Sequence, residues 1–249
     1  EKKYPFYFIT EVSINLADDD ELMRLMVEAG FNSIFVGIET PNNKSLIECG
    51  KMQNLKRDLV ESVNRLQRRG MLVSGGFIVG FDNDKETVFD DQINFIQRSG
   101  ISNAMVGLLN APTGTKLFER MKSEGRLLEM WTGNNMDASI NFVPKMEFKN
   151  LIRGYSRLLN TICSQEEYYK RMKIFLKEYN VPEWTPKVIN LEQLKAFIRL
   201  LWLLGIIEKG KKYFWKLFFV SLWKYPRKFP TAMTLAVYGF HFRRVIRTV

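Results

Sequence analysis

The sequence predicts an α/β fold, in which a partial (β/α) barrel of about four parallel βα units is followed by a mainly α-helical domain. Four short runs rich in β-branched and aromatic residues recur in the first half, each followed by a helical pattern. The runs begin near residues 7, 33, 72 and 102, at the spacing of βα units in a parallel sheet. In the second half, apolar residues recur mostly at helical spacing.

Each βα unit of the first half has its own start and stop signals. An acidic cluster at residues 18–21 suits a positive helix N-terminus, and Gly30, Gly70 and Gly100 mark helix ends. The second unit's helix is expected to break near Gly50. The near-continuous apolar run of the second strand predicts a sheet that is covered on both faces. The expected strands cover residues 7–12, 33–39, 72–80 and 102–110, and the expected helices cover residues 18–30, 85–100 and 115–124 and the broken segment up to 70.

The second half is predicted to consist of helices that are interrupted at prolines. We expect a short strand at residues 139–143, then helices over 148–162, 165–178, 191–207 and 211–224, and a last helix to about 247. Prolines predict a loop at 181–186 and a break at 226–230. We therefore place the domains at residues 1–130 and 131–249, with a sub-boundary at 181–190.

Charge divides the chain in the same way. Of the 37 Lys and Arg and 27 Asp and Glu, residues 1–150 hold 18 basic and 21 acidic groups, a net of −3. Residues 151–249 hold 19 and 6, a net of +13. With two distant cysteines, Cys49 and Cys163, and one histidine, His241, the chain cannot by itself ligate zinc or an iron-sulfur cluster. The lone cysteines favour a reducing compartment, so we expect a cytoplasmic protein.

Polar residues and glycines gather where the predicted strands end. Ligands of parallel α/β folds meet this rim. Each residue also has a purely structural interpretation: Glu39 could start a turn, Glu11 could pair with a surface lysine, and paired glycines could form a bulge. Their shared location favours a binding site. The candidates are Glu11 and Ser13 at the end of the first strand, Glu39 at the end of the second, Gly75 and Gly76 in the third, and Asn110 and Pro112 at the end of the fourth.

These motifs carry a resemblance to a known family. The segments 10–17, 35–41, 50–54, 75–82 and 109–115 resemble strands three to six of a radical S-adenosylmethionine (SAM) enzyme, of the type that usually carries a cobalamin-binding domain ahead of the barrel. The chain is similar to the C-terminal half of that barrel. The tail from about Met146 is similar to the helical domain that follows it.

The resemblance implies the cofactors. In this family a 4Fe-4S cluster binds SAM and cleaves it to a 5′-deoxyadenosyl radical, and the protein supplies orientation. Ribose hydroxyls need acceptors and the SAM carboxylate favours a cation. The resemblance therefore assigns Glu39 to the ribose, Lys51 to the SAM carboxylate, and Glu11 with Ser13 to a polar position on strand three. It places Gly75 and Gly76 beside the adenine, and Asn110 and Pro112 on the substrate side.

One departure from the family concerns the cluster. The three closely spaced cysteines that bind it are absent, as are strands one and two. We expect a fragment whose partner is the missing N-terminal half of the same protein, inactive alone; a natural truncated paralogue is the alternative. The parent protein would methylate or oxidise an unknown small-molecule substrate, for which a lipid-like compound is one candidate, with cobalamin use left open. The alternative function is a non-catalytic binding or membrane-surface module with a vestigial SAM site.

The basic tail has its own alternatives. Trp202, Trp215 and Trp223 lie among lysines and arginines, so residues 195–247 could rest on an anionic membrane surface, leaving the protein peripheral to the membrane. The favoured interpretation is a small bundle with its aromatic residues inside. Nucleic-acid binding is not expected, because no reader motif accompanies the charge.

Overall fold

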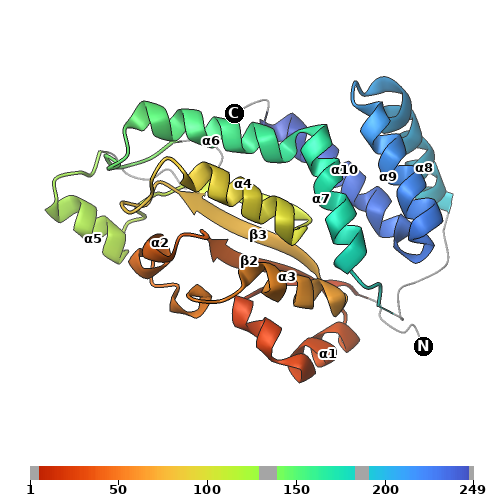
Figure 1. Cartoon of the computed structure of the whole chain (residues 1–249), viewed down its shortest axis with the longest axis horizontal. Coiled ribbons are helices and arrows are strands. Elements are labelled where there is room, and N and C mark those ends of the chain that lie inside the picture. Colours follow the sequence, from red (N-terminus) through yellow and green to blue (C-terminus); the bar gives the residue numbers. More distant parts are fainter. Residues whose placement is uncertain (1–5, 129–138, 183–190, 247–249) are drawn as a thin grey trace.

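Four parallel strands form one sheet in chain order. Figure 1 labels two of them, β2 and β3. The computed structural model describes residues 6–128, 139–182 and 191–246. The strands are β1 (Phe8–Val12), β2 (Phe31–Glu39), β3 (Leu72–Val79) and β4 (Asn103–Leu108). Each pairs in parallel with the next, which confirms the predicted partial barrel of four βα units.

Side chains cap the starts of several helices that connect the strands. The side chains of Asp19, Asp58 and Thr115 each accept a hydrogen bond from a backbone N–H of the first helical turn. The helix predicted to break near Gly50 is divided into α2 and α3. The elements are η1 (Ile14–Asp18), α1 (Asp20–Glu28), α2 (Asn43–Glu48), η2 (Met52–Asn54), α3 (Leu59–Arg68), α4 (Val88–Ser99) and α5 (Lys116–Ser123).

The two faces of the sheet differ in burial. One face is packed beneath α3, α4 and α6, and Ile34, Val36 and Val73 on it are fully buried. The other face is partly open within the described chain, where Met105 is about half exposed and Glu11 is exposed. The prediction of a sheet covered on both faces was therefore wrong for the described residues. Four strands alone do not close a barrel, so its inner face stays accessible.

The second half is helical, as predicted. Its elements are α6 (Phe148–Cys163), α7 (Gln165–Glu178), α8 (Leu191–Trp202), the π-helical turn η3 (Leu203–Ile207), α9 (Lys211–Lys224), η4 (Pro226–Lys228) and α10 (Phe229–Ile246). The expected strand at 139–143 was wrong: Phe142 forms only an isolated antiparallel bridge with Leu127. The break predicted at 226–230 is shorter than expected and covers only η4. Helix α10 already contains Pro230, because the first turn of a helix needs no backbone donor at that position.

Among the described residues, two large hydrophobic cores lie beneath the sheet and within the helical region, and a smaller cluster lies around Phe81, Phe118 and Phe142. Helix α6 contributes Leu151, Tyr155 and Leu158 to the core beneath the sheet. Helices α7, α8, α9 and α10 form a second core around residues such as Phe175 and Phe214. Because α6 belongs to the first core, the two predicted units are joined by shared packing. The domain boundary at residue 130 stays a prediction, and most of the loop predicted at 181–186 lies outside the described residues.

Candidate functional site

The carboxyl end of β2 has an unusual backbone. Glu39 has a φ of 64°, in the left-handed region that residues other than glycine seldom adopt. The register with β3 shifts at the same point: Gly37 pairs with Gly76, but Glu39 pairs with Phe77. Such a bulge re-aims a side chain at the end of a strand. Strained backbone of this kind is concentrated at functional sites, which makes Glu39 a candidate on structural grounds.

The bulge brings Glu39 and Lys51 together. Lys51 Nζ lies 2.9 Å from Glu39 Oε1, and the two side chains are 34% and 16% exposed. Both charged groups lie over Gly37, where a Cβ would meet Glu39 Oε1 at 2.6 Å and Lys51 Nζ at 2.8 Å. The absent side chain at Gly37 therefore gives the ion pair its space. Of the residues that the sequence assigned to SAM, these two are joined by direct contact.

Two side-chain amides hold the irregular strand end. The Asn54 amide donates to the carbonyls of Ile38, at 3.1 Å, and Gly37, at 3.4 Å. The Gln92 amide donates to the carbonyls of Ile78, at 2.7 Å, and Glu39, at 3.4 Å. Both residues are buried, and they satisfy backbone groups near the point where the strand register shifts. Sequence reasoning missed them, although Gln92 interrupts the apolar stripe of α4 and could have been noticed for that reason.

The two glycines of β3, Gly75 and Gly76, lie on opposite faces of the sheet. A Cβ on Gly75 would meet Phe77 and Ile101, so Gly75 makes room for packing on the buried side. A Cβ on Gly76 would meet the Phe35 ring at 2.7 Å. The Phe35 ring therefore lies across Gly76 on the open face. Of the predicted pair, Gly76 is the one that faces the side on which a ligand could lie.

Glu11 and Ser13 lie at the end of β1, the strand that neighbours β2. Glu11 pairs in register with Phe35, so both belong to the open face, and Glu11 is exposed. Ser13 is exposed and precedes η1 without a side-chain capping bond. The structure therefore places Glu11 on the same face as Glu39, and it leaves the Ser13 hydroxyl free of a capping role.

Asn110 and Pro112 follow β4, where hydrogen bonds connect the chain to residues 139–141. The Asn110 side chain accepts from the backbone N–H of Asn141, at 3.1 Å, and donates to the carbonyl of Ser139, also at 3.1 Å. The Asn141 side chain accepts a hydrogen bond from the backbone N–H of Ala111 and donates one to the Ala111 carbonyl. Pro112 accepts from the Thr115 hydroxyl at 2.7 Å. Asn110 thus ties residues 139–141 to the rim, and its amide is already engaged there.

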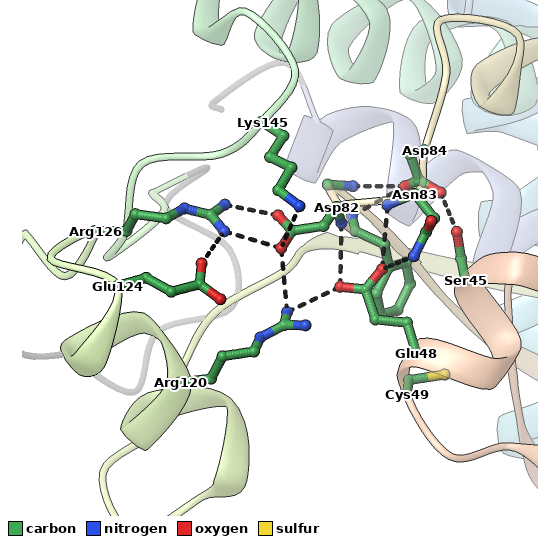
Figure 2. Close-up of polar contacts among 12 residues, drawn as sticks. Ser45, Glu48, Cys49, Asp82, Asn83, Asp84, Arg120, Glu124, Arg126 and Lys145 are labelled. Carbon is green, nitrogen blue, oxygen red and sulfur yellow. Dashed lines mark hydrogen bonds and ion pairs between the residues drawn. The ribbon is translucent and has the colours of Figure 1, made fainter.

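A network of charged groups around Asp82 and Asp84 fixes the position of α2, the helix just before Lys51 (Figure 2). The Ser45 hydroxyl donates to Asp84 at 2.7 Å, and Asp84 accepts from the backbone N–H groups of Gly80 and Phe81. Glu48 accepts from the backbone N–H groups of Asp82 and Asn83. Helix α2 is therefore attached to the loop after β3 through the side chains of Ser45 and Glu48.

Arginines from farther along the chain complete this network. Arg126 forms two hydrogen bonds with Asp82, at 2.6 and 2.9 Å, and Arg120 lies 2.9 Å from Glu48 (Figure 2). The Arg126 guanidinium lowers the pKa of Asp82, whereas burial raises the pKa of Asp84. The Asp82 carboxylate is thus held charged by its partners, and the network positions the segment that carries Lys51.

The site offers an anion, a cation and an aromatic face at one rim of a parallel sheet. These groups suit a polar ligand with hydroxyl, carboxylate and flat ring components. Within the described residues, no group of three or more His, Cys, Asp or Glu side chains is arranged to hold a metal ion.

Comparisons with known proteins show which enzymes this chain is similar to. An uncharacterized methyltransferase of Synechocystis sp. is 35% identical over 254 residues, which cover 99% of this chain and 47% of the relative. The hopanoid C-2 methylase of Rhodopseudomonas palustris is 27% identical over 213 residues, 83% of this chain and 40% of that protein. A bacteriochlorophyllide d C-12(1)-methyltransferase of Chlorobaculum tepidum is 25% identical over 162 residues, 65% of this chain and 35% of its own.

A family match covers the helical part. The family described as a domain of unknown function (DUF4070) matches residues 115–249, more than half of the chain. The chain spans about half the length, or less, of the curated relatives it matches. The chain belongs to the DUF4070 family and thereby to the radical SAM enzymes that usually carry an N-terminal cobalamin-binding domain, of which it represents the C-terminal half of the barrel and the following helical domain.

Proposed function

We propose that this chain is the SAM-holding part of a radical SAM methylase, and that Glu39 and Lys51 bind SAM. The observation that carries the proposal is the left-handed Glu39, whose carboxylate lies over Gly37 beside the Lys51 ammonium. The curated relatives are named as methylases or methyltransferases. Two of the names specify a numbered carbon position, so we infer methylation at a carbon atom of a small-molecule substrate.

The chemistry of the site supports this ligand. The Glu39 carboxylate can accept hydrogen bonds from ribose hydroxyls, and the Lys51 ammonium can bind the SAM carboxylate. An ion pair that is partly exposed contributes only about 0–1 kcal/mol to stability, so a ligand can compete for either partner at small cost. The Phe35 ring, lying across Gly76, offers an aromatic surface on which a flat base can stack. Glu11 adds an acceptor from the neighbouring strand.

Other parts of the same protein would complete the enzyme. The chain has two cysteines, too few for a 4Fe-4S cluster, so we propose that the cluster ligands belong to a preceding half of the barrel. Strand β1 lies at the edge of the sheet, where Ile9 is exposed and further strands could pair. When bound, the cluster and SAM supply the radical chemistry, and cobalamin would serve as the methyl carrier. This chain's residues bind and orient SAM.

The test is SAM affinity in the reconstituted full-length protein, measured by calorimetry. Glu39→Gln should weaken binding by roughly tenfold to a hundredfold, the loss of one hydrogen bond to a charged group. Lys51→Gln should weaken it similarly, whereas Lys51→Arg should retain most of the affinity because the cation is kept. The double variant should lose less than the sum of the two single losses if both groups contact the same molecule.

Glu61→Gln is a matched control. Glu61 also forms an ion pair, with Arg68, but it lies on the exposed side of α3 away from the open face. Its replacement should leave SAM affinity unchanged. Unchanged affinity in Glu39→Gln, with cluster content and fold preserved, would remove Glu39 from the binding site.

A further inference from the structure

Helices α8 and α9 expose several large apolar side chains. They lie at the edge of the helical region, far from α5 (Figure 1). Trp202 is 60% exposed and Trp223 is 76% exposed. We define the α8–α9 outer face by six exposed residues: Leu191, Leu194, Ile198, Trp202, Phe219 and Trp223. The favoured sequence interpretation, that the aromatic residues lie inside the bundle, holds for Phe214 but not for these tryptophans.

Helical spacing places these residues on one side of α8. Leu191, Leu194, Ile198 and Trp202 follow at intervals of three, four and four residues, so they form one stripe along the helix. The opposite side of α8 packs inward through Leu200. Phe197 stacks against Phe218 of α9, which joins the two helices. The apolar stripe therefore runs along the solvent side of the hairpin.

An aromatic ladder extends this face along α9. Trp215, Phe219 and Trp223 are spaced four residues apart, with ring centroids 5.7 and 5.0 Å apart in successive stacked pairs. The Trp215 indole N–H donates to the Gly205 carbonyl at 3.0 Å and anchors the ladder to η3. The inner side of α9 is buried through Phe214 and Leu217. Phe219 and Trp223 therefore lie stacked on the exposed side of α9.

Positive charge surrounds the apolar residues. Residues 191–224 contain seven Lys and Arg and two Glu, a net charge of +5. On α8, Lys195 and Arg199 lie one residue beyond Leu194 and Ile198, so they flank the stripe. On α9, Lys212 and Lys216 are exposed and precede Phe219 within two turns. Exposed aromatic residues and lysines are interleaved on the same face.

We propose that the α8–α9 outer face docks on an anionic lipid membrane surface. Lysine is depleted at the centres of protein–protein interfaces, whereas helices that rest on membranes combine Trp, Phe and Leu with Lys and Arg. Tryptophan is favoured at the boundary between the headgroups and the acyl chains. Lysines beside it reach the anionic headgroups while their methylene stems stay apolar. In the described ranges, no helix combines the length and the apolar character that crossing a bilayer requires.

Vesicle binding by the full-length protein tests this proposal, independently of the SAM site. Wild-type protein should co-sediment with phosphatidylcholine vesicles that contain phosphatidylglycerol, and not with phosphatidylcholine alone. Salt should weaken the binding. Lys212→Gln with Lys216→Gln should weaken it about thirtyfold, since each lysine near an anionic surface contributes roughly fivefold. Trp202→Ala with Trp223→Ala should abolish the quenching of tryptophan fluorescence by brominated lipid.

The matched control is Lys116→Gln with Lys122→Gln on α5. It removes the same charge from exposed positions at the opposite end of the molecule (Figure 1), so vesicle binding should fall much less. SAM affinity and circular dichroism should stay unchanged in all three double variants, which separates docking from folding. Absence of binding by wild type, equal binding to neutral vesicles, or equal losses in the control would each overturn the proposal. A wild-type dimer that Trp223→Ala converts to monomer would assign the face to a second copy instead.

Discussion

Replacing Glu39 by glycine and, separately, by alanine tests whether the end of β2 is strained. Both variants remove the same carboxylate and the same ion pair with Lys51, so that loss cancels in the comparison. What differs is the backbone. Glycine adopts a φ of 64° without steric conflict, whereas alanine keeps the Cβ that makes this conformation costly.

The expected magnitude follows from two opposing terms. At an ordinary strand position glycine is roughly 0.5–1 kcal/mol less favourable than alanine, because it loses more backbone entropy on folding. A left-handed conformation costs a residue with a Cβ roughly 1–2 kcal/mol. At position 39 the cost of the left-handed conformation should exceed the entropy cost of glycine. Glu39→Gly should therefore be about 0.5–1 kcal/mol more stable than Glu39→Ala, a reversal of the usual order.

Urea unfolding of the two variants, compared at equal slope, measures this difference. Ala104→Gly in β4 is the control, because Ala104 does not have a positive φ, and it should destabilise by roughly 0.5–1 kcal/mol. If Glu39→Gly were less stable than Glu39→Ala, the left-handed backbone and its proposed strain would be refuted. Both variants should bind SAM weakly, since neither restores the carboxylate.

Two further predictions concern packing and charge. Gly154→Ala on α6 should destabilise by roughly 1–3 kcal/mol, because its Cβ would overlap the Phe89 ring. Gly107→Ala in β4 meets open space and should instead stabilise by roughly 0.5–1 kcal/mol, because alanine loses less backbone entropy on folding. Arg126→Gln should destabilise by about 1–3 kcal/mol at neutral pH by leaving Asp82 with weaker partners. Since the native pKa of Asp82 is lowered, this difference should shrink as the pH falls from the ordinary aspartate range through the lowered value, and denaturant unfolding at several pH values measures it. A difference that grew in acid would contradict the assignment.

The network around Asp82 and Asp84 explains how a flexible lysine acquires a defined position. Lys51 precedes η2 directly, three residues after Glu48 ends α2. Helix α2 has only six residues and could not hold itself in place by its own hydrogen bonds. Its attachment through Ser45 and Glu48 to the loop after β3 supplies that rigidity. The Glu39–Lys51 contact therefore depends on residues outside the ion pair itself.

Most of the fold could be predicted because the pattern of each element is local. Strand runs, acidic helix starts and glycine stops predicted the βα units, and the four strands pair in the order in which the sequence presents them. The strand predicted at 139–143 failed because β-branched composition does not supply a partner strand. Among the described residues its backbone pairs with residues 126–128, and hydrogen bonds between Asn110 and Asn141 hold it at the rim.

The candidate site was only partly accessible from the sequence. Glu39 and Glu11 were found because they are polar residues at the ends of predicted strands. Lys51 was assigned through the family resemblance. Gly75 and Gly76 could not be assigned to opposite roles, since that depends on which face each residue presents. Asn54 and Gln92 were missed because their partners are backbone carbonyls exposed by a bulge that no local pattern reveals.

The βα order and the helical second half follow from the periodicity of the sequence. The charge asymmetry follows from its composition, and the family follows from the order of its motifs. The tertiary structure decided that Glu39 turns back over Gly37 toward Lys51, that α6 joins the core beneath the sheet, and that two tryptophans of the basic helices face solvent. These features depend on contacts between distant residues. Local propensity cannot specify them, because the same side chain is buried or exposed according to what packs beside it.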